Sequence, residues 1–166
     1  MLIEKIEQEA ERVLSELGIT KVPTPVEDIA LRLGMRISRA PSSDFSGLLL
    51  RKDGKALIGV NSQEPLVRQR FTIAHEIGHF LLHPQQDAFV DFRKSRNADE
   101  ARPPRERQAD MFAAALLMPR GPLLLDFRKL AKDGDTSRVI PVLATKYSVS
   151  AEAMRFRLIN LNSLVR

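Results

Sequence analysis

Three histidines, the only ones in this 166-residue chain, lie within nine residues, at positions 75, 79 and 83. The first two enclose a glutamate in the pentapeptide His75-Glu76-Ile77-Gly78-His79, which has the pattern HExxH. Residues four apart on a helix share one face, so both imidazoles can bind one divalent ion. Glu76, one residue further round the helix, can then reach a water on that ion and act as general base. The alternative is that His75 and His79 are core or surface histidines with no metal.

A catalytic zinc ion usually has three protein ligands, so this pattern requires a third. Glu106, 27 residues beyond His79, begins an ExxxD pair with Asp110 on a separate predicted helix. We expect Glu106 to bind the ion and Asp110 to accept the N–H of a liganding imidazole, as in thermolysin-like zincins. The alternative is that Glu106 is a surface acid paired with Arg102 or Arg105.

Other side chains near the HExxH pattern could supply the third ligand. On a continuous helix His83 lies about 12 Å along the axis from His75, so we expect it at the helix end or beside a ligand. Asp87 and Glu100 remain alternative ligands, because the loop that contains them could fold inward. Zinc is the expected ion, although Mn²⁺ and Fe²⁺ also occupy sites with two histidines and one glutamate.

The elements that must position these residues follow from apolar spacing and turn residues. An apolar stripe from about residue 65 to residue 83 predicts a long helix that carries the HExxH pattern. Asp53-Gly54, between apolar runs at 48–51 and 56–60, predicts a β-hairpin, and a third strand is expected at 35–37. Further helices are predicted over residues 2–17, 26–33, 104–117 and 123–131.

This pattern of elements predicts an α+β fold. The expected form is a mostly helical core with a small antiparallel sheet, followed by a helix-turn-helix-like segment. The best linker is Lys132-Asp133-Gly134-Asp135-Thr136. We therefore expect a core over residues 1–133 and a C-terminal segment over residues 134–166, packed on or beside that core.

Composition excludes several classes of protein. The chain has no cysteine, which rules out thiolate catalysis, disulfides and iron–sulfur ligation and fits a reducing compartment. No apolar run approaches the ~20 residues of a membrane span, and the acidic N-terminus differs from a secretory signal. We expect a cytoplasmic protein that does not contact a membrane.

The C-terminal segment carries five basic and two acidic residues within the overall net charge of +5. Residues 139–147 and 151–161, joined by a short turn, predict a helix-turn-helix. Arg155 and Arg157 are expected to be exposed there, to phosphates or to acidic side chains, whereas Phe156, Leu158 and Leu161 indicate packing. A structural or substrate-docking role is therefore favoured over DNA contact for this segment.

Two blocks of sequence resemble the ImmA/IrrE family of metallopeptidases. They are residues 68–84, RQRFTIAHEIGHFLLHP, and residues 106–119, ERQADMFAAALLMP, in the order typical of that family. The resemblance extends to residues 31–38 and to the segment around 143–158. It covers most of the chain, with one departure, because the family often has asparagine where this chain has Asp110.

The resemblance implies an α+β, zincin-like metallopeptidase core followed by a helix-turn-helix-like segment. It also implies a zinc endopeptidase whose substrate is a transcriptional repressor of the helix-turn-helix type, within a phage, mobile-element or stress circuit. It assigns His75, His79 and Glu106 as zinc ligands and Glu76 as the catalytic acid-base. The larger IrrE-type proteins have an additional C-terminal sensory domain, which we do not expect after Arg166. The alternatives are a DNA-binding regulator and a toxin-antitoxin-type regulatory protein with a metal site.

Peptide hydrolysis would also use a donor that faces the developing oxyanion. Tyr147, His83 and several arginines are candidates, and the sequence does not choose among them. An extended substrate is expected to pair with the strand at residues 56–60, as peptides commonly do with an exposed sheet edge.

Overall fold

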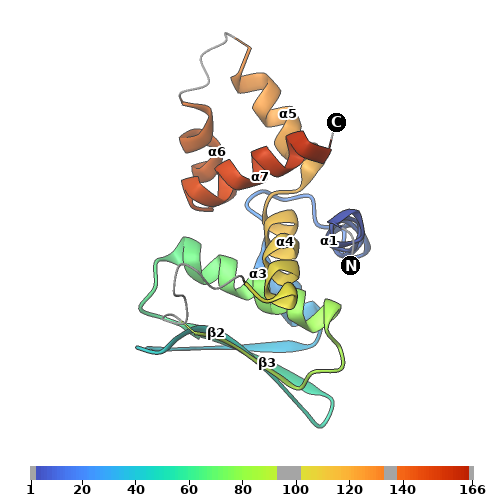
Figure 1. Cartoon of the computed structure of the whole chain (residues 1–166), viewed down its shortest axis with the longest axis vertical. Coiled ribbons are helices and arrows are strands. Elements are labelled where there is room, and N and C mark those ends of the chain that lie inside the picture. Colours follow the sequence, from blue (N-terminus) through green and yellow to red (C-terminus); the bar gives the residue numbers. More distant parts are fainter. Residues whose placement is uncertain (1–2, 93–101, 133–137, 165–166) are drawn as a thin grey trace.

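The structure is a computed structural model that describes residues 3–92, 102–132 and 138–164. The fold class is α+β, as predicted. A four-stranded sheet lies at one end, α3 crosses it, and α5, α6 and α7 lie at the opposite end (Figure 1). The elements of the described residues are α1 (Ile3–Glu16), α2 (Val26–Arg32), β1 (Met35–Ala40), β2 (Phe45–Lys52), β3 (Lys55–Asn61), α3 (Leu66–Leu82), β4 (Ala88–Phe92), α4 (Pro104–Leu117), α5 (Arg120–Leu130), α6 (Val139–Tyr147) and α7 (Ala151–Leu164).

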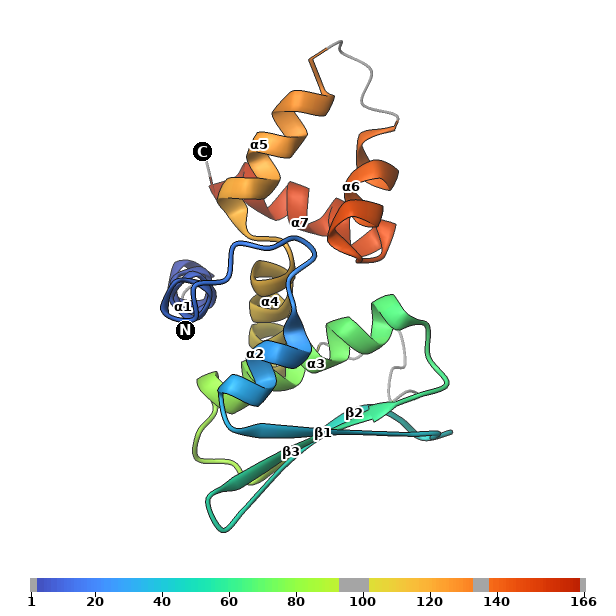
Figure 2. The same ribbon diagram turned by 180° about the vertical axis from the view of Figure 1, so that it is seen from behind.

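The two N-terminal helices form where apolar spacing predicts them. Helix α1 packs against α4, and it buries a stripe formed by Ile6, Ala10, Val13 and Leu14. Helix α2 lies against β1 and α3 on the side of the molecule seen in Figure 2. Gly34, at φ 85°, allows the chain to leave α2 and enter β1, because glycine adopts this left-handed conformation without a Cβ clash.

The sheet has the strand order β1-β3-β2-β4. Strands β2 and β3 form the predicted hairpin, with Asp53 and Gly54 both at positive φ in its turn. Strand β1 pairs with β3 in parallel, so the sheet is mixed and not purely antiparallel. The prediction that residues 56–60 form an exposed edge is wrong, because β3 lies between β1 and β2. Among the described strands the edges are β1 and β4.

Helix α3 lies across this sheet against β2 and β3, and α4 packs tightly on α3. Gly78 makes that close approach possible, since a Cβ at this position would lie 3.2 Å from both the Cα and the carbonyl oxygen of Ala109. The two helices therefore approach each other at the turn of α3 that carries His79. This packing brings the side chains of α4 over the HExxH segment.

Helices α5, α6 and α7 form the part of the molecule furthest from the sheet (Figure 1). Helix α7 is held to the rest of the chain by Arg157, which pairs with Glu7 of α1 and donates to the carbonyl oxygen of Met118 at 3.0 Å. The prediction that Arg157 is exposed is wrong, because only 3% of it is accessible. Arg155 is exposed, as expected.

Helices α6 and α7 are joined by a tight turn in which Ser148 adopts φ 52°. This is the spacing of a helix-turn-helix, although its first helix has nine residues and packs against both α5 and α7. No helix in the described ranges combines the length and the apolar character that crossing a bilayer demands.

Candidate metal centre

Two helices supply three side chains that converge on one point. His75 and His79 come from consecutive turns of α3, and their Nε2 atoms are 3.0 Å apart. Glu106, in the first turn of α4, places one carboxylate oxygen 3.2 Å from Nε2 of His75 and the other 3.2 Å from Nε2 of His79. Both histidines are buried, whereas the Glu106 side chain is 24% exposed.

This geometry fits a divalent ion. Ligand atoms about 2.0–2.1 Å from a tetrahedral ion lie about 3.3 Å from one another, close to the three distances found here. His75 directs Nδ1 to Oδ1 of Asp110 at 3.0 Å, and an N–H must donate in that bond because the carboxylate only accepts. The neutral ring therefore presents a lone pair on Nε2, beside the Glu106 carboxylate. A divalent cation between these electron-pair donors would offset their mutual repulsion.

Asp110 joins this centre from the next turn of α4. It accepts from His75 and also contacts the guanidinium of Arg102. Such an outer hydrogen bond fixes the tautomer and orientation of a liganding imidazole. Arg102 therefore pairs with Asp110, whereas Arg105 donates to the side chain of Gln86.

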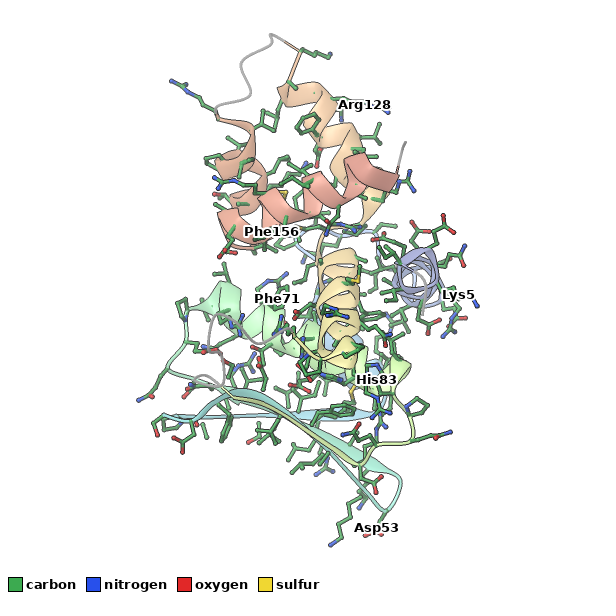
Figure 3. The ribbon with its side chains drawn as sticks, viewed as in Figure 1. Lys5, Asp53, Phe71, His83, Arg128 and Phe156 are labelled. Carbon is green, nitrogen blue, oxygen red and sulfur yellow. The ribbon has the colours of Figure 1, made fainter. Side chains whose placement is uncertain are left out.

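His79 has different surroundings. Its Nδ1 lies 3.0 Å from Nδ1 of His83, and Nε2 of His83 lies 2.9 Å from Oε1 of Gln108 in α4. The ring of Phe89, from β4, stacks on His79 with centroids 3.9 Å apart. His83 is the C-terminal capping residue of α3, and Figure 3 shows it where that helix ends near the sheet.

Glu76 is fully buried between α3 and the sheet. Neither of its carboxylate oxygens has a hydrogen-bond partner among the described residues. Burial raises the pKa of Glu76 to about 8; the nearby carboxylates of Asp91 and Glu106 add to this effect, while His75 opposes it. Gly47 of β2 lies next to Glu76, since a Cβ at this position would be 3.1 Å from Oε1 of Glu76.

The ligand candidates are held in the protonation states that metal binding requires. Burial acts to raise the pKa of Glu106, but a proton shared between its carboxylate and Nε2 of His75 or His79 outweighs burial and holds that pKa well below its usual range. A bound cation would take the place of that shared proton. Burial lowers the pKa of His79, which favours the neutral ring.

The other residues considered from the sequence lie elsewhere. Asp87 is exposed and does not belong to the cluster, and Glu100 falls outside the described residues. Tyr147 is buried and donates its hydroxyl to Oδ2 of Asp126 at 2.9 Å, between α6 and α5. Its hydroxyl is therefore committed there, and its candidacy as the oxyanion donor fails.

Sequence reasoning did not identify Gln108 or Phe89 as neighbours of the centre. Gln108 lies between Glu106 and Asp110, and only the packing of α4 on α3 shows that its side chain reaches His83. A separate, open pocket of about 430 Å³ lies between α3, α4 and α7, on the side of Asp110. Asp110 lines it together with Phe71 and Phe156, which are labelled in Figure 3.

An HExxH helix, a glutamate from the following helix and a buried glutamate beside them define the site of a metallopeptidase-type domain. Residues 30–159 match the peptidase M78 family model, described as the IrrE N-terminal-like domain. The chain therefore belongs to this family of metallopeptidase domains.

Two curated relatives are named radiation response metalloprotease IrrE. The protein from Deinococcus deserti is 38% identical over 102 residues, which cover 61% of this chain and 35% of that protein. The protein from Deinococcus radiodurans is 34% identical over 102 residues, or 61% of this chain and 30% of that protein. The chain thus spans about a third of the length of these relatives.

A solved structure shares the fold. It is named Mycobacterium tuberculosis transcriptional regulator, and it superposes with a TM-score of 0.63 at 18% identity. The match covers 93% of this chain and 46% of that one. At this identity the likeness concerns the fold alone.

Proposed function

We propose that this chain is a zinc-dependent endopeptidase that hydrolyses a peptide bond within a protein substrate. The observation that carries the proposal is the convergence of His75, His79 and Glu106 beside a buried carboxylate whose oxygens have no partner among the described residues. Zinc suits this set of two imidazoles and one carboxylate, and Mn²⁺ or Fe²⁺ can use the same ligands.

His75, His79 and Glu106 would hold a divalent ion, whose chemistry would be to polarise the scissile carbonyl and to lower the pKa of a bound water. Both oxygens of Glu76 lack a partner among the described residues, and a nearby cation would favour the ionised form of this carboxyl group. Ionised Glu76 would take the proton of the attacking water and return it to the leaving amine nitrogen. His75, held by Asp110, keeps its ring orientation through this cycle. The buried walls around Glu76 exclude bulk water and so preserve the strength of these interactions.

We further propose that the substrate is a transcriptional repressor of the helix-turn-helix type, in a phage, mobile-element or stress circuit. The resemblance to ImmA/IrrE proteins supports this, and the relatives' name, radiation response metalloprotease, agrees with a stress circuit. A cytoplasmic location agrees with such a substrate and with a chain that has no cysteine.

A DNA-binding regulator, including one of toxin-antitoxin type, is the second candidate, because α6 and α7 have helix-turn-helix spacing. Of the two arginines considered for phosphate contact, Arg155 is exposed and Arg157 is buried against Glu7. Because Arg157 is buried, only one of the two arginines expected to contact phosphate can do so, which weakens this candidate. Duplex binding that falls steeply with salt would restore it.

Metal analysis and cleavage profiling test the proposal together. We expect about one zinc ion per wild-type chain, severe loss of zinc in His79→Ala and Glu106→Ala, and retained zinc in Glu76→Gln. In cells that express the wild type, profiling of protein N-termini should reveal new termini that are missing with Glu76→Gln. Glu152→Gln, an exposed glutamate in α7, is the matched control and should behave as the wild type. The same new termini with Glu76→Gln would refute the assignment of the general base.

A further inference from the structure

The two liganding imidazoles are supported by different partners. His75 donates to a carboxylate, that of Asp110, whereas Nδ1 of His79 faces another histidine ring at 3.0 Å. We propose that His83 is a positioning residue that accepts a hydrogen bond from Nδ1–H of His79 and thereby holds the Nε2 lone pair of His79 toward the metal ion. This inference rests on the proposed function, because it requires the same metal centre.

The direction of this hydrogen bond follows from the atoms at its far end. Nε2 of His83 lies 2.9 Å from Oε1 of Gln108, and an amide oxygen only accepts, so Nε2 of His83 carries a proton. Both histidine rings are buried, which favours neutral imidazole with one proton per ring. Nδ1 of His83 is then an acceptor, and the proton between the two rings belongs to His79. Nε2 of His79 is left with a lone pair, as a metal ligand needs.

The fold holds His83 where this bond can form. The residue ends α3 with φ −127° and ψ 59°, while its backbone N–H still donates to the carbonyl oxygen of His79 at 3.0 Å. Arg51, from β2, donates to the carbonyl oxygens of His83 at 3.0 Å and of His79 at 3.2 Å. The ring of Phe89 packs against both imidazoles, with centroids 3.9 Å and 5.7 Å away. The ring of His83 is therefore confined on several sides before any ion binds.

The expected effect is on metal affinity. Loss of an outer hydrogen bond to a liganding histidine typically weakens metal binding about 10–100-fold. Without His83 the ring of His79 can carry its proton on Nε2, and that form cannot bind the ion until the proton moves. The free energy of unfolding of the metal-free chain depends on packing, so a replacement of similar shape should change it little.

The test measures zinc affinity of the full chain by competition with a chromophoric chelator. His83→Phe keeps an aromatic ring and removes the acceptor, so we expect about 10–100-fold weaker binding. His83→Asn places an amide oxygen near the position of Nδ1, so we expect it to recover most of the affinity. Gln85→Leu changes an exposed neighbour and serves as the matched control, with wild-type affinity. The unfolding temperature of each metal-free variant should stay close to that of the wild type.

A second pair of variants tests the same hydrogen bonds with His83 in place. Gln108→Leu removes the acceptor that sets the His83 proton, so zinc binding should weaken, whereas Gln108→Glu keeps an acceptor and should not lose affinity. Adding Gln108→Leu to His83→Phe should cause no further loss, because both changes remove one chain of hydrogen bonds. Additive losses would overturn the proposal, as would full affinity in His83→Phe or equal losses in His83→Phe and His83→Asn.

Failure of this inference can be distinguished from failure of the proposed function. A wild-type chain that binds zinc and cleaves in a Glu76-dependent way, with a His83→Phe variant of unchanged affinity, would overturn the role of His83 alone. A wild-type chain that binds no divalent ion would overturn both.

Discussion

The buried carboxyl group of Glu76 should make the metal-free chain less stable as the pH rises, and Glu76→Gln should remove this effect. The side chain has no exposed surface, and neither carboxylate oxygen has a partner among the described residues. Ionisation in such a place loses the hydration of the charge without replacement. Glutamine keeps the size of the side chain and carries no charge at any pH.

The sign of the effect follows from the raised pKa. Burial raises the pKa of Glu76 from 4.5 to about 8 in the folded chain, while the unfolded chain keeps the ordinary value. The folded state therefore binds this proton more tightly than the unfolded state does. Its contribution to stability is fully present below about pH 4.5 and is lost as the pH rises through about 8.

The size of the effect follows from the same two values. Each unit of pKa difference is equivalent to about 1.4 kcal/mol, so the full shift from 4.5 to about 8 sets an upper limit of about 5 kcal/mol. We therefore expect Glu76→Gln and the wild type to differ little near pH 4.5. Above pH 8 the variant should be more stable by several kcal/mol, up to that limit.

Denaturant unfolding of chelator-treated protein, followed by circular dichroism across this pH range, measures the difference directly. Glu152→Gln is the matched control, because it removes an exposed carboxylate and one negative charge, the same change of charge that Glu76→Gln makes once Glu76 is ionised. Added zinc should shrink the difference, since a nearby cation stabilises the ionised form of Glu76. A difference between the wild type and Glu76→Gln that stays flat with pH would refute the reasoning.

Two further predictions concern the close contact of β2 with α3 and the buried ion pair between α7 and α1. Gly47→Ala should destabilise the chain by about 1–3 kcal/mol in denaturant unfolding, because its Cβ would lie 2.2 Å from a threonine side chain of α3. The control Gly121→Ala, where a Cβ meets open space, should not destabilise it. Arg157→Met should cost about 3–5 kcal/mol in the same assay, since it leaves the carboxylate of Glu7 in a largely buried position without its partner. Exposed Arg155→Met should change stability by less than about 0.5 kcal/mol, and equal losses in both arginine variants would contradict the assigned role of the pair.

Local patterns in the sequence predicted most of the helices and the hairpin. The apolar stripe of α1 and the Asp53-Gly54 turn depend on residues close together in the chain, which is why spacing and turn chemistry were sufficient. The arrangement of the strands was not predicted. Strand β1 pairs with β3 and not with its neighbour in sequence, and such pairing depends on non-local hydrogen bonds that no short window contains. The same limit explains the wrong assignment of residues 56–60 to an edge.

Exposure in the C-terminal helices was predicted poorly for a related reason. Arg155 and Arg157 lie two residues apart, and an arginine usually remains in solvent. Arg157 is the buried one because it pairs with Glu7, which lies 150 residues earlier in the chain. Glu7 lies beside α7 only after α1 has packed against α4. A paired charge can be buried where an isolated one cannot, so the partner must be known before the exposure can be predicted.

Residue spacing alone could only partly predict Glu106 as the third ligand candidate. The sequence places two imidazoles on one helix face. Asp87, Glu100 and Glu106 all lie close enough along the chain for their carboxylates to reach these imidazoles. The close contact at Gly78 is what brings α4 onto α3, and a larger residue there would push the two helices apart. The position of the Glu106 carboxylate therefore depends on Gly78, a residue within the HExxH pattern that has no side chain and serves only to let α4 approach. In the proposed metal centre, ion binding and helix packing are therefore coupled, since displacement of α4 by about 1 Å would exceed the tolerance of about 0.5 Å that such a site allows.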